Sequence, residues 1–117
     1  MVSGLPLPSV ASGATPLSTL KTIRGVTVYA AQNHETSLIQ HFRSLGAKGY
    51  TITEARGVGE HAHLDDPFAH STHTRIELLV PPEVAERIMN YLSSSTVKHL
   101  SIVACVENVE VIESEHF

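Results

Sequence analysis

The sequence predicts an α+β protein with a ferredoxin-like βαββαβ fold, in which one antiparallel sheet carries two helices on one face. Two observations support this prediction. The chain divides into two similar strand–helix–strand halves joined by a long polar loop, and its 117 residues suffice for one ordinary domain but not for two. Apolar residues make up 42% of the chain and charged residues 17%, so a packed core is expected.

The first half contains a strand, a helix and a second strand. Residues 23–30 are β-branched and partly alternating, which predicts a strand. Apolar residues then recur at helical spacing and predict an amphipathic helix at about 35–45, with Gly46 as its stop. Polar and apolar residues alternate strictly over 50–56, which predicts the second strand.

The second half repeats this order after a loop at 57–73 that is polar and rich in histidine. A loop of this length inside a small domain is unusual and is often functional. A helix is predicted at 83–94, because proline at position 82 suits a first helical turn and an apolar stripe follows it. The remaining predicted strands are a third at 75–80, a fourth at 100–106 and a short edge strand at 109–112.

One stretch lies outside this pattern. Residues 1–19 have no charged side chain and no periodicity, so we expect a flexible arm ahead of a single domain at 20–117.

The strands are more apolar than a solvated sheet face requires. If both helices pack on one face, the other face also needs cover, and such domains usually associate with further copies. The residues behind this expectation are Val26, Val28, Ile52, Ile76, Leu78 and Val103.

Charge and composition exclude several classes of function. Eight Lys and Arg against twelve Asp and Glu give a net charge of −4, so non-specific binding of nucleic acid is not expected. No stretch predicts a membrane span or a signal peptide, and a cytoplasmic location is the simplest expectation. The single cysteine, Cys105, excludes an intramolecular disulfide and is expected to be a small buried apolar residue in its strand.

An enzyme is not expected either. No Ser or Cys stands beside a His and an acid in a pattern that suggests a nucleophilic triad. Glu54 and Glu77 lie on predicted strands and could form a carboxylate pair, but a salt bridge with Arg56 or Arg75 is the simpler interpretation.

The run from Gly46 to Gly59 resembles the PII signalling family. In that family the second strand carries a G-x-T-x-T-E-x-x-G-x-G pattern that leads into a long segment called the T-loop. The chain matches it at Gly49, Thr51, Thr53, Glu54, Gly57 and Gly59. The run Arg75-Ile-Glu-Leu-Leu-Val-Pro-Pro82 and the run Val106-Glu-Asn-Val109 are similar to later parts of the family, and the whole resembles most the branch associated with bicarbonate transport and carboxysomes.

This resemblance implies a homotrimer that binds adenine nucleotides in the clefts between subunits and controls a partner, such as a membrane transporter, through a T-loop at 57–73. Gly-x-Gly after a strand lets backbone N–H groups approach a phosphate closely, and a threonine on the strand can read an adenine edge. The nucleotide-binding residues expected on this basis are Gly49, Thr51, Gly57, Gly59, His61 and Lys98.

Departures from the family pattern favour AMP or ADP over ATP. The family's glycine-rich turn is replaced here by residues 94–99, where Lys98 is the one lysine. The family's two phosphate-binding arginines fall near Val111 and Glu113. Negative charge at this point repels a polyphosphate, so a less charged nucleotide, together with bicarbonate or another small anion, is the expected ligand set.

The loop histidines support an alternative interpretation. His61, His63, His70 and His73 lie within thirteen residues at spacings that zinc and copper sites use. The alternative to a nucleotide sensor is therefore a trimer that binds a divalent metal, similar to the copper-tolerance relatives of this fold. A solvated histidine-rich loop that binds no metal explains the same residues.

Overall fold

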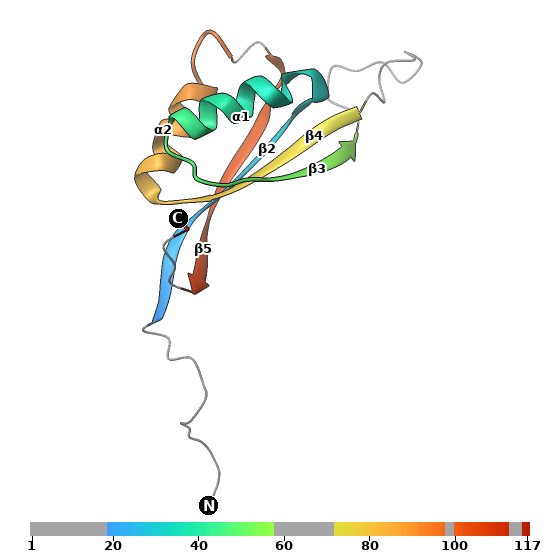
Figure 1. Ribbon diagram of the computed structural model, residues 1–117. Coiled ribbons are helices and arrows are strands. Elements are labelled where there is room, and N and C mark those ends of the chain that lie inside the picture. Colours follow the sequence, from blue (N-terminus) through green and yellow to red (C-terminus); the bar gives the residue numbers. More distant parts are fainter. Residues whose placement is uncertain (1–18, 58–71, 98–99, 113–115) are drawn as a thin grey trace, which may run out of the picture.

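A computed structural model describes residues 19–57, 72–97, 100–112 and 116–117, and Figure 1 shows its arrangement. The elements follow the predicted order of strand, helix, strand, strand, helix, strand. They are β2 (Leu20–Ala31), a 3-10 turn η2 (Gln32–His34), α1 (Glu35–Ser44), β3 (Thr51–Arg56), β4 (Thr72–Val80), α2 (Pro82–Leu92) and β5 (Val103–Ile112). The predicted arm, apart from its last residue, and most of the predicted loop lie outside the described residues.

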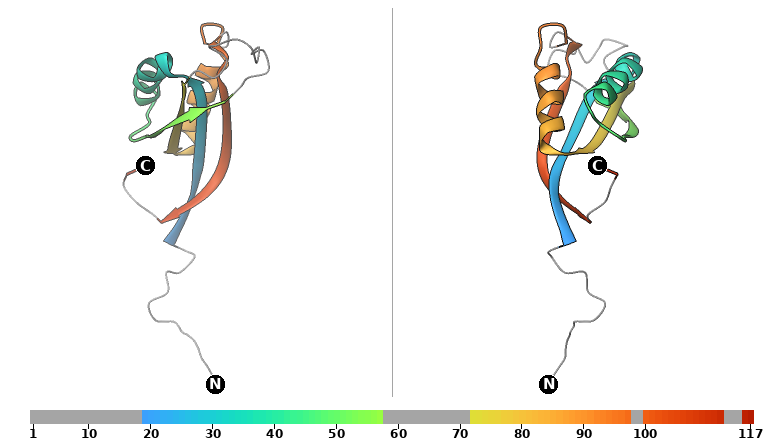
Figure 2. Two further views of the ribbon diagram at one scale, coloured as in Figure 1. Left: turned by 90° about the vertical axis from the view of Figure 1, so that its right-hand side faces the viewer. Right: turned by 60° about the vertical axis from the view of Figure 1, so that its left-hand side comes forward.

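The four strands form one antiparallel sheet in the order β3-β4-β2-β5. This order, with both helices on one face, is the predicted ferredoxin-like fold (Figures 1 and 2). β2 pairs with β4 only from Arg24 onward, whereas its pairing with β5 begins at Leu20. The first residues of β2 and the end of β5 therefore form a two-stranded ribbon that runs past the helices (Figure 1).

Helix α1 ends in a C-terminal cap at Gly46. The Ala47 N–H donates to the Phe42 carbonyl and the Gly46 N–H donates to the Arg43 carbonyl, at 3.0 and 3.1 Å, which is the hydrogen-bond pattern of a Schellman motif. Gly46 has φ +119°, a conformation that residues with a Cβ rarely adopt. The Arg87 Nε of α2 donates to the carbonyl of Leu45 at 2.9 Å and so ties the end of α1 to the second helix.

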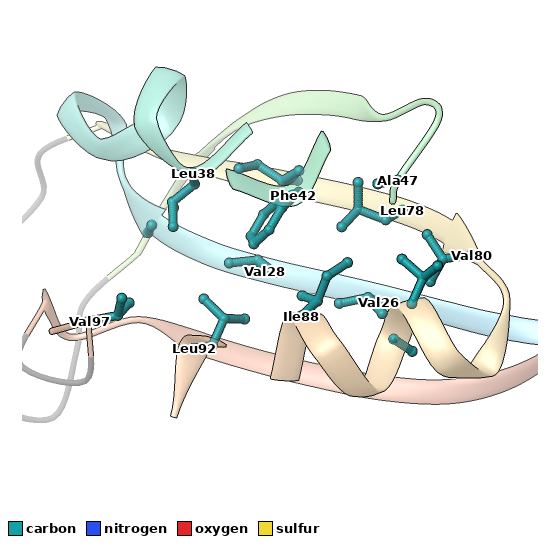
Figure 3. Close-up of a cluster of buried hydrophobic side chains, with 14 residues drawn as sticks. Val26, Val28, Leu38, Phe42, Ala47, Leu78, Val80, Ile88, Leu92 and Val97 are labelled. Carbon is teal, nitrogen blue, oxygen red and sulfur yellow. The ribbon is translucent and has the colours of Figure 1, made fainter. Parts of the chain in front are cut away.

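Helix α2 begins as predicted at the proline pair. Pro81 is the N-cap and Pro82 opens the helix. Its apolar stripe, Val84, Ile88 and Leu92, is buried against the sheet. Figure 3 shows Ile88 and Leu92 facing Leu38 and Phe42 of α1 over Val26 and Val28 of β2. The core is therefore a single layer between two helices and one sheet face.

Three predicted strands have wrong boundaries. β2 begins at Leu20, three residues before its predicted start. β4 begins at Thr72, so the last two residues of the predicted loop, including His73, belong to a strand. The fourth strand and the short edge strand, predicted separately, are one strand from Val103 to Ile112. The polar residues Glu107 and Asn108 do not interrupt it, because they continue the ladder opposite Gly25 and Arg24.

The prediction about the second sheet face is partly wrong in its residues. Val26, Val28, Ile76 and Leu78 are buried under the helices, and Ile52, paired with Ile76, shares their face. Of the predicted set, only Val103 lies on the opposite face, which we call the helix-free face. By strand register this face comprises Ile23, Gly25, Thr27 and Tyr29 of β2, Thr51, Thr53 and Ala55 of β3, His73, Arg75, Glu77 and Leu79 of β4, and Val103, Cys105, Glu107 and Val109 of β5.

Candidate functional site

The helix-free face mixes exposed apolar side chains with a few charges. Tyr29, Leu79 and Val103 are 38%, 44% and 63% exposed, although they occupy the middle strands and one edge of the sheet. Between them, the Arg75 guanidinium forms an ion pair with the Glu77 carboxylate at 2.8 Å. This is the predicted strand-face salt bridge. Glu54 lies on the other face, so the two glutamates do not form a carboxylate pair.

A pocket of about 380 Å³ opens at the beginning of β3, and we call it the start pocket. It contains two of the predicted nucleotide-binding residues, Gly49 and Thr51. Thr51 is the β3 partner of Glu77 on β4, and this register brings the hydroxyl and the carboxylate to one place. The described lining is Gly49, Tyr50, Thr51, Glu77, Leu79, His116 and Phe117.

A second pocket of about 330 Å³ lies beyond the end of β3, and we call it the end pocket. It contains Gly57 from the nucleotide-binding set and His73 from the metal-binding set. Arg56 provides a cation beside them, and Ser101 approaches from the connection between α2 and β5 with a left-handed φ of 56°. The described lining is Tyr29, Ala55, Arg56, Gly57, His73, Ser101 and Val103.

The two pockets lie at opposite ends of one strand. Thr51 opens β3 and Gly57 follows its last residue, so at about 3.3 Å per residue the two positions are roughly 20 Å apart. The structure therefore does not bring Gly49, Thr51 and Gly57 into one pocket of a single chain. It places them in two separate pockets, both lined by residues of the helix-free face.

The glycines of both pockets leave room for a ligand. A Cβ built on Gly49 or on Gly57 meets no atom of the described residues within 4 Å. Neither glycine has a left-handed φ, since Gly46 is the one described glycine that does. The backbone at both positions is therefore open to an approaching group, and neither conformation requires glycine for the fold itself.

The remaining predicted site residues have mixed outcomes. Gly59, His61, His63, His70 and Lys98 lie outside the described residues. His73 is a strand residue of β4, where it pairs with Ala31 and with Ala55. Within the described part of the chain, no group of three or more His, Cys, Asp and Glu residues is placed to hold a metal ion.

Sequence reasoning missed several residues of these pockets and misjudged one cysteine. Tyr29, Ser101 and Phe117 have no motif of their own, and they join the pockets because distant elements meet there. Glu77 could have been found, because the strict alternation of two adjacent strands places it opposite Thr51. Cys105 is exposed rather than buried, because its strand turns that position toward the helix-free face.

The chain is similar to known regulatory proteins over most of its length. The family described as Nitrogen regulatory protein P-II matches residues 23–116. A PII-like signalling protein from Thermus thermophilus is 38% identical, with 80% of this chain and 91% of that chain covered and a TM-score of 0.66. No curated protein matches the chain significantly.

Two structures of a more distant protein share the fold. CPII, a nitrogen regulatory PII-like protein from Thiomonas intermedia K12 bound to ADP, AMP and bicarbonate, is 20% identical, with 81% of this chain and 98% of that chain covered and a TM-score of 0.69. The apo form of CPII is also 20% identical, with 79% of this chain and 94% of that chain covered and a TM-score of 0.59. None of the helices in the described ranges has the length and apolar character to cross a membrane.

Proposed function

This chain belongs to the nitrogen regulatory protein P-II family, whose members are signalling proteins rather than enzymes, and from that premise we propose what it senses and how. We propose that it forms a homotrimer that binds ADP or AMP in the clefts between subunits. Bicarbonate or a similar small anion is the second ligand. The bound state sets the T-loop at 57–73, which acts on a partner such as a membrane transporter.

The single observation that carries this proposal is the division of the predicted nucleotide residues between two pockets. Thr51 and Gly57 are roughly 20 Å apart along β3, which is too long for one adenosine diphosphate to bridge. Both pockets are lined by residues of the helix-free face. If a neighbouring subunit places its end pocket against the start pocket of the first, one nucleotide contacts both halves. A cyclic trimer repeats that contact three times.

The chemistry of the two halves supports one orientation of the nucleotide. The start pocket offers the Thr51 hydroxyl, the Glu77 carboxylate and the apolar Leu79, with no Lys or Arg in its described lining. Because the Glu77 carboxylate pairs with Arg75, this lining suits the base and the ribose hydroxyls and offers no Lys or Arg to a phosphate. The end pocket offers the Arg56 guanidinium and the open backbone at Gly57, which suit a phosphate.

Assembly through the helix-free face is supported by its exposed apolar residues. Tyr29, Leu79 and Val103 would be solvated in a monomer. Several large apolar side chains exposed on one sheet face favour an interaction surface there. The relatives provide independent support for the ligands, since CPII has been solved with ADP, AMP and bicarbonate.

A complementation experiment tests the shared site directly. Gly49→Asp places a carboxylate in the start pocket and Gly57→Asp places one in the end pocket. Both substitutions find open space among the described residues and an unstrained backbone, so both variants should fold. Calorimetry with ADP should show that each variant alone loses binding, because a carboxylate now repels or displaces the ligand.

The two variants are then co-expressed so that their subunits mix. In a shared site, a start pocket from the Gly57→Asp chain can meet an end pocket from the Gly49→Asp chain, and random mixing restores about a quarter of the clefts. If the site lies within one chain, every chain carries one broken half and no binding returns. Full ADP binding by either variant alone would refute the assignment of its pocket.

A further inference from the structure

We propose that Phe117 and Tyr50 form an aromatic clamp for the purine base in the start pocket. The inference rests on the proposed function, because it concerns the same start pocket. It identifies two residues that determine ligand specificity.

The position of Phe117 is the first observation. In the sheet order β3-β4-β2-β5, two strands separate β5 from β3. His116 and Phe117, which follow β5 in the chain, nevertheless line a pocket made by the beginning of β3 and the end of β4. Phe117 therefore lies beside strands that are not neighbours of the strand it follows, and it is half-buried.

The composition of the pocket is the second observation. Tyr50 and Phe117 bring a phenol and a phenyl ring to its lining, and Leu79 adds an aliphatic surface. Tyr50 is 44% exposed, which leaves its ring available for contact. A pocket of about 380 Å³ falls in the range of small-molecule sites, roughly 300–1,000 Å³. Aromatic walls beside one carboxylate are the surroundings in which a planar base stacks.

The charge of the start pocket supports the same assignment. Its described lining contains Glu77 and no Lys or Arg, and the Glu77 carboxylate already pairs with Arg75 at 2.8 Å. This lining offers no Lys or Arg to a phosphate, whereas its aromatic side chains can contact a neutral base. A purine offers more stacking surface than a pyrimidine, so the clamp favours ADP over UDP.

Calorimetry with ADP on the full chain tests the clamp. We expect Phe117→Ala to weaken ADP binding about tenfold, as loss of one base–aromatic stack does, and Phe117→Tyr to bind like the wild type. Ile112→Ala is the matched control, because it removes another apolar side chain near the end of β5, 69% exposed and outside the described lining of both pockets. The control should leave ADP affinity unchanged.

A fluorescence measurement reports stacking separately from affinity. The diphosphate of 2-aminopurine riboside loses emission when its base stacks on an aromatic ring. We expect strong quenching at saturation with the wild type and weaker quenching with Phe117→Leu, which keeps an apolar side chain but removes the ring. Thermal unfolding of each variant shows that it is folded.

The outcomes distinguish the two proposals. If the wild type does not bind ADP, the proposed function fails. If the wild type binds ADP and Phe117→Ala binds it equally well, the clamp is refuted while the proposed function stands. If Phe117→Ala binds more tightly, Phe117 occupies the place of the base and competes with it, which also refutes the clamp.

Discussion

Replacing Gly46 by alanine should destabilise the domain, whereas the same replacement at Gly49, three residues later, should not. Gly46 has φ +119°, and a Cβ there would lie 3.0 Å from Arg87 Nη2 and 3.1 Å from Val84 Cγ2. Val84 is buried in the core and cannot move without opening the packing under α2. Gly49 has no left-handed φ, and a Cβ there meets no described atom within 4 Å.

The magnitude follows from these contacts. Holding a residue with a Cβ in a sparsely populated backbone region costs about 1–3 kcal/mol. Displacing Arg87 also weakens its 2.9 Å hydrogen bond to the Leu45 carbonyl, a further loss of about 1 kcal/mol. The lower entropy of the unfolded alanine chain returns about 0.4–1 kcal/mol. The net loss for Gly46→Ala is therefore about 2 kcal/mol, and Gly49→Ala should be neutral or slightly stabilising.

Urea unfolding followed by circular dichroism measures the free energy of unfolding of both variants. All samples need one protein concentration, because the stability of an oligomer depends on it. Equal free energies of unfolding for Gly46→Ala and Gly49→Ala would refute the argument, since the two positions would then be equivalent. An unchanged slope with urea would show that the same surface is exposed on unfolding in all variants, so that a shifted midpoint reports a change in stability.

The remaining predictions concern a buried hydroxyl, a half-buried tyrosine and the assembly. Thr74 is 1% exposed, and its hydroxyl has no hydrogen-bond partner among the described residues. Thr74→Val should therefore raise the free energy of unfolding, measured in urea, by about 1 kcal/mol. A loss of stability in this variant would mean that the hydroxyl makes a stabilising hydrogen bond. Partial burial raises the pKa of the Tyr91 hydroxyl above its ordinary value of 10.0. The folded state therefore holds this proton more tightly than the unfolded chain does. The stability of the fold is unaffected by this group below pH 10 and falls as the pH rises through the folded-state pKa. Alkaline unfolding curves should show that decline in the wild type and less of it in Tyr91→Phe. Light scattering should give a mass of about 38 kDa, three times the 12.7 kDa of one chain. Cys105, which is exposed in the single chain, should react slowly with a thiol reagent in the trimer. A monomer mass together with fast labelling of Cys105 would refute the shared clefts.

Local patterns were sufficient to predict most of the fold. The apolar spacing of Leu38 and Phe42, the stop at Gly46 and the proline pair before α2 act over one or two helical turns, and each element appears where its pattern predicts. The order of elements then leaves few ways to build one antiparallel sheet, and the ferredoxin-like arrangement is among them. Errors concern the boundaries, where a strand extends as far as its partner continues the ladder, as at Thr72 and Glu107.

The candidate site could be predicted only in part. The pattern from Gly49 to Gly57 predicts nucleotide-binding residues, and both glycines line pockets in the structure. The sequence motif does not reveal the distance between these pockets. That distance follows only once the residues between them form an extended strand, which rises about 3.3 Å per residue. The family resemblance led us to expect a cleft between subunits, and the length of β3 supplies the physical argument for it.

The sequence by itself determined the element types, the helix ends and the family, because those depend on neighbours in the chain. The tertiary structure decided which residues share a face and which distant segments meet. Val26 and Ile76 became core, while Cys105 and Val103 became exposed, because strand register sets the side of the sheet on which each residue lies. Phe117 lines one pocket with Tyr50 and Glu77 although it follows β5, and no local pattern records that these residues, far apart in sequence, lie together.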